Sequence, residues 1–140
     1  KFITASYGMG VNYVSPNDVA DASVVVLLNQ KPHRNKVYNL TGAKPIRDSE
    51  VVKILNEFSP TPIQHVELGF HAYAADVKNR GLADWQVRDA AAFERMKASG
   101  IDEDHSEYTH DLELLIGKKP ESFNDYLSNK SCMRPGLTFP

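Results

Sequence analysis

Three short β-prone runs alternate with helical patterns along the first half of this sequence, and this alternation restricts the fold more than any other feature. The runs cover residues 11–14, 37–40 and 63–68, and the third alternates apolar and polar residues as a half-buried strand does. Helical patterns lie between them. Strands joined through helices are typical of an α/β fold. We therefore expect about three strands, in a small sheet or in part of a larger one.

The two helices between these runs have recognisable starts. Ser15 can cap the first helix, Pro16 suits its first position, and Asp18 complements its positive end. This helix extends to about Leu28 and is apolar on nearly every side towards its end, which predicts that it is buried. The second helix covers residues 48–58, where Asp48 or a water molecule provides the cap.

The second half of the sequence is helical. Apolar residues at helical spacing predict helices over about residues 70–80, 84–99, 110–116 and 122–128. Gly81, Gly100 and Gly117 end the first three of these helices, Thr109 can cap the third, and Ser122 can cap the last. Residues 131–140 have no period, so we expect a flexible tail.

Composition narrows the function classes. With 140 residues, 41% hydrophobic and 24% charged, the chain fits one compact domain. Its formal charge of −2 is spread along the chain, which does not suggest a nucleic-acid groove or a membrane surface. No signal peptide or membrane-spanning run is visible, so we expect a cytoplasmic protein. Cys132 is the only cysteine, which leaves no internal disulfide and no multi-cysteine zinc site.

Four motifs resemble the NmrA-like atypical short-chain dehydrogenases/reductases. An aromatic strand runs into an Asp-Val-Ala helix over residues 13–22, and a Tyr-Asn-Leu-Thr-Gly strand end follows within residues 36–42. Residues 50–55 are similar to the next helix of that family, and residues 114–123 are similar to its closing Leu-x-Gly-x-x-Pro-x-Ser/Thr-Phe pattern. The resemblance covers about residues 10–128, and the order and spacing of the motifs make it specific.

This resemblance implies a fold and a division of the chain. Residues 1–68 are expected to be the carboxy-terminal strands and helices of a Rossmann-like domain, and residues 69–130 a helical, substrate-binding subdomain. Residues 131–140 form the expected tail. Two positions depart from the family pattern: Arg47 stands where Ser or Thr usually caps a helix, and Ala83 stands where a proline usually precedes the Asp-Trp pair.

The largest departure from the family is a missing cofactor loop. Family members bind NAD or NADP through a Gly-x-x-Gly-x-x-Gly turn that leads into a helix, because the pyrophosphate approaches the backbone too closely for side chains. Gly8 and Gly10 are the nearest match, but Tyr13 occupies the third glycine position. We therefore expect an ordinary turn there, and no cofactor-binding residue is identifiable. The sequence also begins with Lys1, as if entered in mid-chain, so a preceding Rossmann half is expected.

The resemblance also implies an activity. The intact protein would bind NADP or NAD and reduce a small carbonyl or quinone substrate, or would sense redox state without turnover. This chain alone would not catalyse hydride transfer. The alternative is a non-catalytic interaction or regulatory module of the same fold that binds a partner protein. The sequence does not identify the catalytic residues of the intact protein.

Five large side chains form the candidate substrate pocket. Helices after the last strand form the substrate lid in proteins that this chain resembles, and large rigid side chains suit a flat apolar substrate. Helical spacing would equally give a plain core. Tyr73 and Trp85 are the members expected to face a pocket, because each carries a hydrogen-bonding group. The full set is Phe70, Tyr73, Trp85, Phe93 and Met96.

Two other motifs have a simpler interpretation. Tyr126 and Lys130 have the Tyr-x-x-x-Lys spacing of classical dehydrogenases, but Tyr126 lies at an inward helical position and is read as core. Residues 105–111 contain two histidines and two acidic residues. The histidines are five residues apart and do not share a helix face, so we predict a solvated loop and no metal site.

Overall fold

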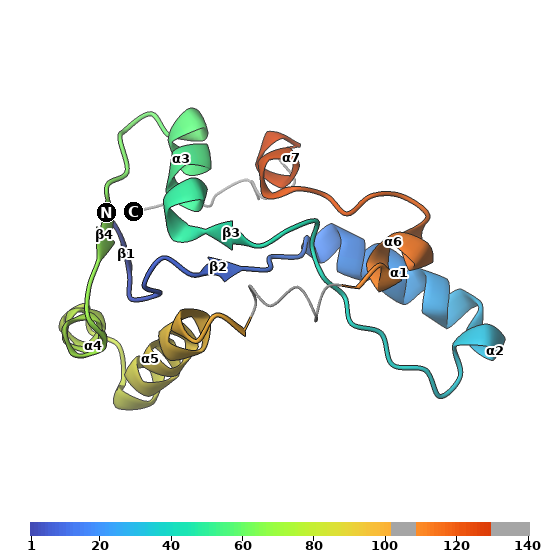
Figure 1. The fold of residues 1–140 in the computed structure, drawn as a ribbon, viewed down its shortest axis with the longest axis horizontal. Coiled ribbons are helices and arrows are strands. Elements are labelled where there is room, and N and C mark those ends of the chain that lie inside the picture. The colour runs from blue at the N-terminus through green and yellow to red at the C-terminus, as the bar shows by residue number, and fades with distance from the viewer. Residues whose placement is uncertain (102–108, 130–140) are drawn as a thin grey trace. The chain divides into compact units, whose positions relative to one another are not determined.

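In this computed structural model, described for residues 1–101 and 109–129, helices outnumber short strands (Figure 1). The strands are β1 (Phe2–Thr4), β2 (Gly10–Val11), β3 (Ile46–Arg47) and β4 (His65–Glu67). The helices are α1 (Pro16–Leu28), α2 (Gln30–His33), α3 (Asp48–Phe58), α4 (Phe70–Asn79), α5 (Asp84–Ala98), α6 (Asp111–Ile116) and α7 (Phe123–Ser128). The mixed α/β class predicted from the sequence is therefore confirmed.

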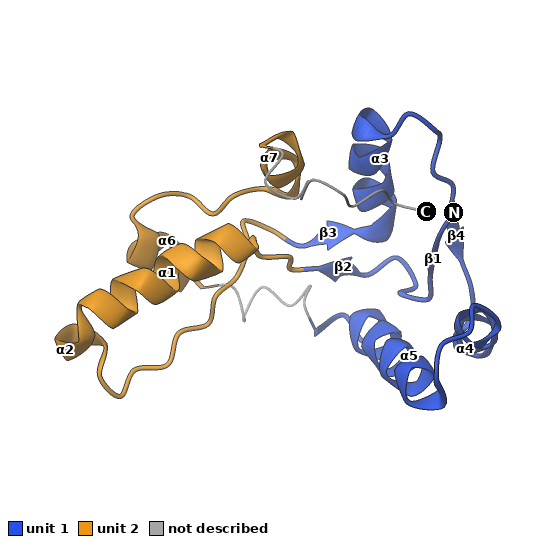
Figure 2. Ribbon diagram, turned by 180° about the vertical axis from the view of Figure 1, so that it is seen from behind, with its two compact units in different colours: residues 1–11, 45–105 blue, residues 12–44, 106–140 orange. Residues whose placement is uncertain are grey.

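The chain divides into two compact units (Figure 2). Unit 1 contains residues 1–11 and 45–105, and unit 2 contains residues 12–44 and 106–140. Each unit is therefore built from two separate stretches of sequence. The division into residues 1–68, 69–130 and 131–140 stays a prediction, and its tail lies outside the described residues.

Unit 1 contains both strand pairs. β1 pairs in parallel with β4, with Ile3 opposite Val66, and β2 pairs antiparallel with β3. The amide of Phe2 donates to the Gln64 carbonyl at 2.8 Å, and the amide of Leu68 donates to the Thr4 carbonyl at 2.8 Å. The strand predicted over residues 63–68 is thus confirmed at its centre.

The other strand predictions need correction. The predicted strand over residues 11–14 is wrong beyond Val11, and residues 37–40 form no strand in the described structure. Two real strands, β1 and β3, were not predicted. A strand is defined by its ladder with a neighbour, and local β-propensity carries no information on whether a neighbour is present.

Local start and stop signals placed the helices correctly. The hydroxyl oxygen of Ser15 accepts a hydrogen bond from the Asn17 amide at 3.2 Å, and that of Ser122 accepts one from the Asp125 amide at 3.1 Å. Gly117 ends α6 with φ +67°, a left-handed conformation that favours glycine. The short helix α2 was missed.

Two details of the helix predictions are wrong. The carboxyl end of α1 is not buried, since Leu28 is 84% exposed and Leu27 is 66% exposed. Among the described elements of unit 2, the short helix α6 is the main packing partner of α1, and it leaves the carboxyl end of α1 exposed. In α3 the capping position belongs to Arg47, whose amide donates to the Glu50 carboxylate at 3.0 Å. Asp48 points elsewhere, into the interior of unit 1.

Each unit has its own small apolar core. Helix α3 contributes Val51 and Val52 to the core of unit 1, and α6 contributes Leu112, which is fully buried, to the core of unit 2. Unit 1 also buries several charged side chains, which is unusual because burying a charge is costly unless it is paired. These charged residues define the first candidate site.

Candidate functional site

A buried ionic cluster lies at the centre of unit 1. Lys97 is 3% exposed, and its ammonium lies 2.8 Å from Asp48 Oδ2 and 3.0 Å from Glu94 Oε1. The hydroxyl of Ser6 donates to Asp48 Oδ2 at 2.7 Å, and the amide of Ala5 donates to Glu94 Oε2 at 2.6 Å. We call Asp48, Glu94, Lys97 and Ser6 the Lys97 cluster.

Three elements bring the Lys97 cluster together. Asp48 is the first residue of α3, while Glu94 and Lys97 lie one turn apart on α5. Residues three apart on a helix are neighbours on its surface, so the Glu94–Lys97 pair follows from the helix alone. Ser6 follows β1. The cluster therefore joins the start of α3, the carboxyl-terminal part of α5 and the segment just after β1.

The two neighbouring carboxylates keep the ammonium group of Lys97 protonated. Burial alone would lower the pKa of Lys97, but the hydrogen bonds and charges of Asp48 and Glu94 outweigh burial and raise that pKa above its usual value. Lys97 is therefore a fixed cation at neutral pH. Since two carboxylates face one ammonium, its positive charge is fully engaged within the cluster.

Tyr73, on α4, lies beside the Lys97 cluster and is half-buried. Desolvation raises the pKa of Tyr73, and the negative charge of Glu94 raises it further. The phenol is therefore protonated at neutral pH and can donate a hydrogen bond. A raised pKa suits a phenol that keeps its proton and donates a hydrogen bond better than one that releases its proton.

These two pKa shifts predict alkaline destabilisation. Tyr73 and Lys97 hold their protons more tightly in the folded than in the unfolded chain, where values near 10.0 and 10.5 apply. The stabilisation is therefore present below about pH 10 and is lost as pH rises through the raised values. Urea unfolding between pH 7 and 11.5 should give a free energy of unfolding that falls only in the upper part of this range.

Tyr73→Phe should make this fall in the free energy of unfolding shallower. An unchanged slope would contradict a contribution from the raised pKa of Tyr73.

The structure distributes the five predicted pocket residues over two packed helices. Phe70 and Tyr73 lie on α4, and Trp85, Phe93 and Met96 lie on α5. They do not all converge. Trp85, 58% exposed, is eight residues from Phe93 on the same helix, which corresponds to about 12 Å along its axis.

Phe70 and Phe93 each have a cationic side chain near the ring, and Phe70 also has an aromatic neighbour. The ring of Tyr7 meets Phe70 edge-on with centroids 5.0 Å apart, and the Arg95 guanidinium lies 5.5 Å from the Phe70 centroid. The Lys97 ammonium lies 5.9 Å from the Phe93 centroid. Tyr7 has φ +53°, an uncommon backbone conformation for a residue with a side chain. Sequence reasoning missed Tyr7 and Arg95, since only the folded structure brings them to Phe70.

The glycine turn at Gly8 does not fit a dinucleotide. Tyr7 and Gly8 both have positive φ, and the Met9 amide closes the turn on the Ser6 carbonyl at 3.2 Å. This turn leads from β1 into β2, whereas a phosphate loop leads from a strand into a helix whose amino end attracts the anion. We therefore derive no catalytic step through a cofactor on these residues.

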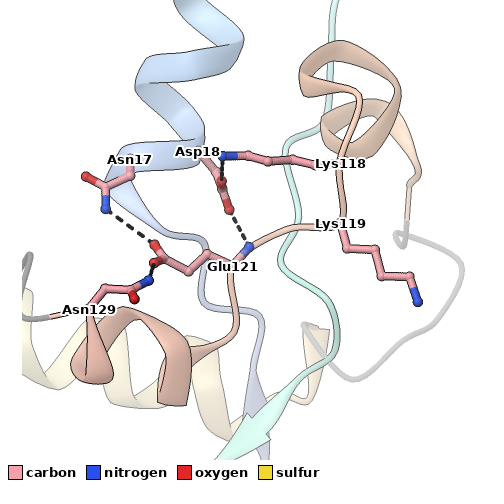
Figure 3. A pocket seen from close by; sticks show the side chains of 6 residues that line it. All are labelled: Asn17, Asp18, Lys118, Lys119, Glu121 and Asn129. Atoms are coloured by element: carbon pink, nitrogen blue, oxygen red, sulfur yellow. Dashed lines mark hydrogen bonds and ion pairs between the residues drawn. The ribbon is translucent and has the colours of Figure 1, made fainter.

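A polar pocket lies in unit 2 and has a volume of about 370 Å³. Figure 3 shows that most of its side chains turn towards one another, whereas that of Lys119 points away. The Asp18 carboxylate accepts from the Glu121 amide at 2.6 Å, and the Glu121 carboxylate accepts from Ser15 at 2.6 Å and from Asn129 at 2.8 Å. The hydrogen bond from Ser15 lowers the pKa of Glu121. These partners largely satisfy one another, so we interpret the pocket as a clamp that holds residues 118–121 on α1.

Two kinds of site were not found in the described part of the chain. No group of three or more His, Cys, Asp or Glu side chains is placed to hold a metal ion, although most of the histidine-rich segment 105–111 lies outside the described residues. No described helix is long and apolar enough to cross a membrane.

No protein-family model matches this chain, and no curated protein sequence matches it. Solved structures do. Over 91% of this chain, the fold matches Citrobacter sp. triphenylmethane reductase complexed with NADP(H), with a TM-score of 0.79 and 26% identity, and covers 43% of that chain. It also matches 44% of the Escherichia coli NADPH-dependent quinone oxidoreductase QOR2 complexed with NADPH, over 91% of this chain, with a TM-score of 0.77 and 22% identity.

A third solved structure extends the range of activities on this fold. It is a Staphylococcus aureus nucleoside-diphosphate-sugar epimerase, matched over 89% of this chain and 42% of its own length with 22% identity and a TM-score of 0.71. This chain thus spans less than half the length of each of these proteins. Its fold is that of the carboxy-terminal portion of Rossmann-like reductases.

Proposed function

We propose that this chain is the substrate side of an NmrA-like, NAD(P)H-dependent oxidoreductase that reduces a small, flat carbonyl or quinone compound. The observation that carries the proposal is the 26% identity with triphenylmethane reductase, a protein whose structure was solved with NADP(H), across 91% of this chain. The four NmrA-like motifs in the sequence support the same assignment. NADP or NAD would be bound by a partner half with a Rossmann-type sheet, because the Gly8 turn does not fit a dinucleotide.

The described residues suggest how a flat substrate would be held. Phe93 and Met96 are nearly half exposed on α5, where aromatic and thioether groups can cover an apolar ring. The protonated phenol of Tyr73 can donate to a substrate oxygen, and the Lys97 cluster fixes the α5 backbone from which Phe93 and Met96 project. In this proposal the aromatic groups orient the substrate, and Tyr73 polarises its carbonyl.

Trp85 allows a direct test, because it is the only tryptophan in the chain. Titration with menadione, a naphthoquinone, should quench its fluorescence along a saturable curve, beyond the linear quenching of free N-acetyltryptophanamide. Phe93→Ala should weaken the apparent affinity about three- to tenfold, because one ring contact is lost.

A matched surface substitution in unit 2 provides the control. Leu114 is exposed on α6, so Leu114→Ala should leave the titration unchanged. Linear quenching that equals that of the free amino acid, or an affinity that Phe93→Ala does not alter, would refute the substrate assignment.

A further inference from the structure

Three side chains from different elements of unit 1 meet at one aromatic ring. Phe70 begins α4, Arg95 lies on α5, and Tyr7 lies in the turn between β1 and β2. The Arg95 guanidinium lies over the Phe70 ring, 5.5 Å from its centroid, and the Tyr7 ring meets Phe70 edge-on with centroids 5.0 Å apart. We call these three residues the Phe70 group.

The polar ends of Arg95 and Tyr7 are available to a ligand. Both residues are exposed, Tyr7 to 53%. Within the described residues, neither the guanidinium nor the phenol hydroxyl has a hydrogen-bond or ion-pair partner. A guanidinium can contact a ring through its face and still present N–H donors at its rim, where they match the two oxygens of a carboxylate. The Phe70 group can therefore bind an oxyanion.

Tyr7 is held in an unfavourable backbone conformation. Its φ of +53° is uncommon for a residue with a side chain. The two preceding residues are completely buried, and the Lys97 cluster anchors both of them, through the amide of Ala5 and the hydroxyl of Ser6. Unfavourable conformations persist where the surrounding structure fixes them, and they gather at ligand sites. The anchored segment therefore fixes the place at which Tyr7 presents its hydroxyl.

The Phe70 group adjoins the candidate substrate pocket. Phe70 and Tyr73 lie three residues apart on α4, so their side chains are neighbours on the helix surface. Tyr73 offers a neutral donor for a substrate oxygen, whereas Arg95 offers a positive charge. A flat ligand on this face would meet both groups, and its charge would decide how much it gains from Arg95.

We propose that the Phe70 group binds an anionic substituent, such as a carboxylate, on the flat aromatic substrate of this protein. Arg95 supplies the charge-assisted hydrogen bonds, Tyr7 supplies a second donor, and Phe70 supports the guanidinium from below. The inference rests on the proposed function, because it names the charge of the substrate at that same site. The Phe70 group would thus select among flat compounds by their charge.

Two quinones that differ in charge but hardly in shape can test this proposal. Equilibrium dialysis of the 140-residue chain against anthraquinone-2-carboxylate and anthraquinone-2-carboxamide would give both affinities, with the ligand measured by its absorbance. We expect the carboxylate to bind about tenfold more tightly than the neutral amide, because hydrogen bonds to charged groups are the stronger ones. Raising the salt concentration should reduce this preference.

Three variants assign the preference to its residues. Arg95→Gln should weaken carboxylate binding about tenfold and change amide binding by less than about twofold. Tyr7→Phe keeps the ring and removes the hydroxyl, so it should weaken carboxylate binding about threefold. Arg88→Gln is the matched control, because Arg88 is exposed on the same helix and its replacement removes the same charge. It should leave both affinities within about twofold.

Several results would overturn the proposal. Equal affinities for the two quinones, or binding of neither, would exclude selection by charge. A loss in Arg88→Gln as large as that in Arg95→Gln would show that only net charge matters. Displacement of the carboxylate by millimolar inorganic phosphate would identify a general oxyanion site without an aromatic requirement. If the carboxylate binds through Arg95 but menadione does not bind the chain, the anion site stands and the quinone assignment fails.

Discussion

Replacing Lys97 with methionine should destabilise the chain by about 3–5 kcal/mol. The substitution keeps most of the side-chain volume but leaves Asp48 and Glu94, which are 1% and 4% exposed, as two buried carboxylates without a cation. Removing one partner of a buried ion pair is costly because the remaining charge keeps its desolvation penalty. Urea unfolding at pH 7, followed by circular dichroism, would measure the change in the free energy of unfolding.

Two comparisons test whether charge is the cause. Lys118 also pairs with two carboxylates, those of Asp18 and Asp21, but its side chain is 57% exposed. The buried Asp18 keeps its hydrogen bond from the Glu121 amide when Lys118 is replaced, so Lys118→Met should change the stability little. Combining Lys97→Met with Asp48→Asn and Glu94→Gln should recover much of the loss, since no buried charge then remains. A Lys97→Met variant as stable as Lys118→Met would refute the electrostatic explanation.

Gly42→Ala should destabilise unit 2 by about 3 kcal/mol, at the upper end of overpacking costs. A Cβ at this position would overlap the backbone carbonyl oxygen of Tyr13, and backbone cannot swing aside as a long side chain can. The close approach is fixed by the Gly42 amide, which donates to Asn12 Oδ1 at 2.8 Å. Thermal unfolding of purified variants would measure the loss.

Gly69→Ala is the matched control. A Cβ there would lie 3.7 Å from the Tyr7 hydroxyl, an ordinary contact, and Gly69 has φ −71°, which any residue adopts. The expected cost is at most about 1 kcal/mol, from exchanging glycine for alanine at the capping position of α4. Equal losses in both variants would show that the space around Gly42 is not the reason.

The sequence allowed good prediction where structure is determined locally. α1 and α7 begin where Ser15 and Ser122 predicted, because a capping side chain acts on amides two or three residues away. The strands were harder, since β1 depends on a neighbour about sixty residues later in the chain. Residues 37–40 have the composition of a strand but no ladder partner among the described residues.

The candidate site could be predicted only in part. The helical spacing placed Phe70 and Tyr73 on one helix and Phe93 and Met96 on the next, as the structure has them. The Lys97 cluster gave no comparable signal. Except for the Glu94–Lys97 pair, its contacts join distant residues: Ser6 and Asp48 are 42 residues apart, and Asp48 and Lys97 are 49 apart. A charged pair one turn apart usually lies on a solvated helix face, so nothing in the sequence marks this one as buried.

The interleaving of the two units affects how the chain can be cut or synthesised. Unit 1 begins with residues 1–11 and resumes at residue 45, after the first stretch of unit 2. No single cleavage point therefore releases either unit whole, and a proteolytic nick near residue 44 would divide both. During synthesis β1 leaves the ribosome long before β4 exists, so it must wait, unpaired, for about sixty residues. Closure of such long loops slows folding, so β1 should be among the last parts of the chain to gain protection.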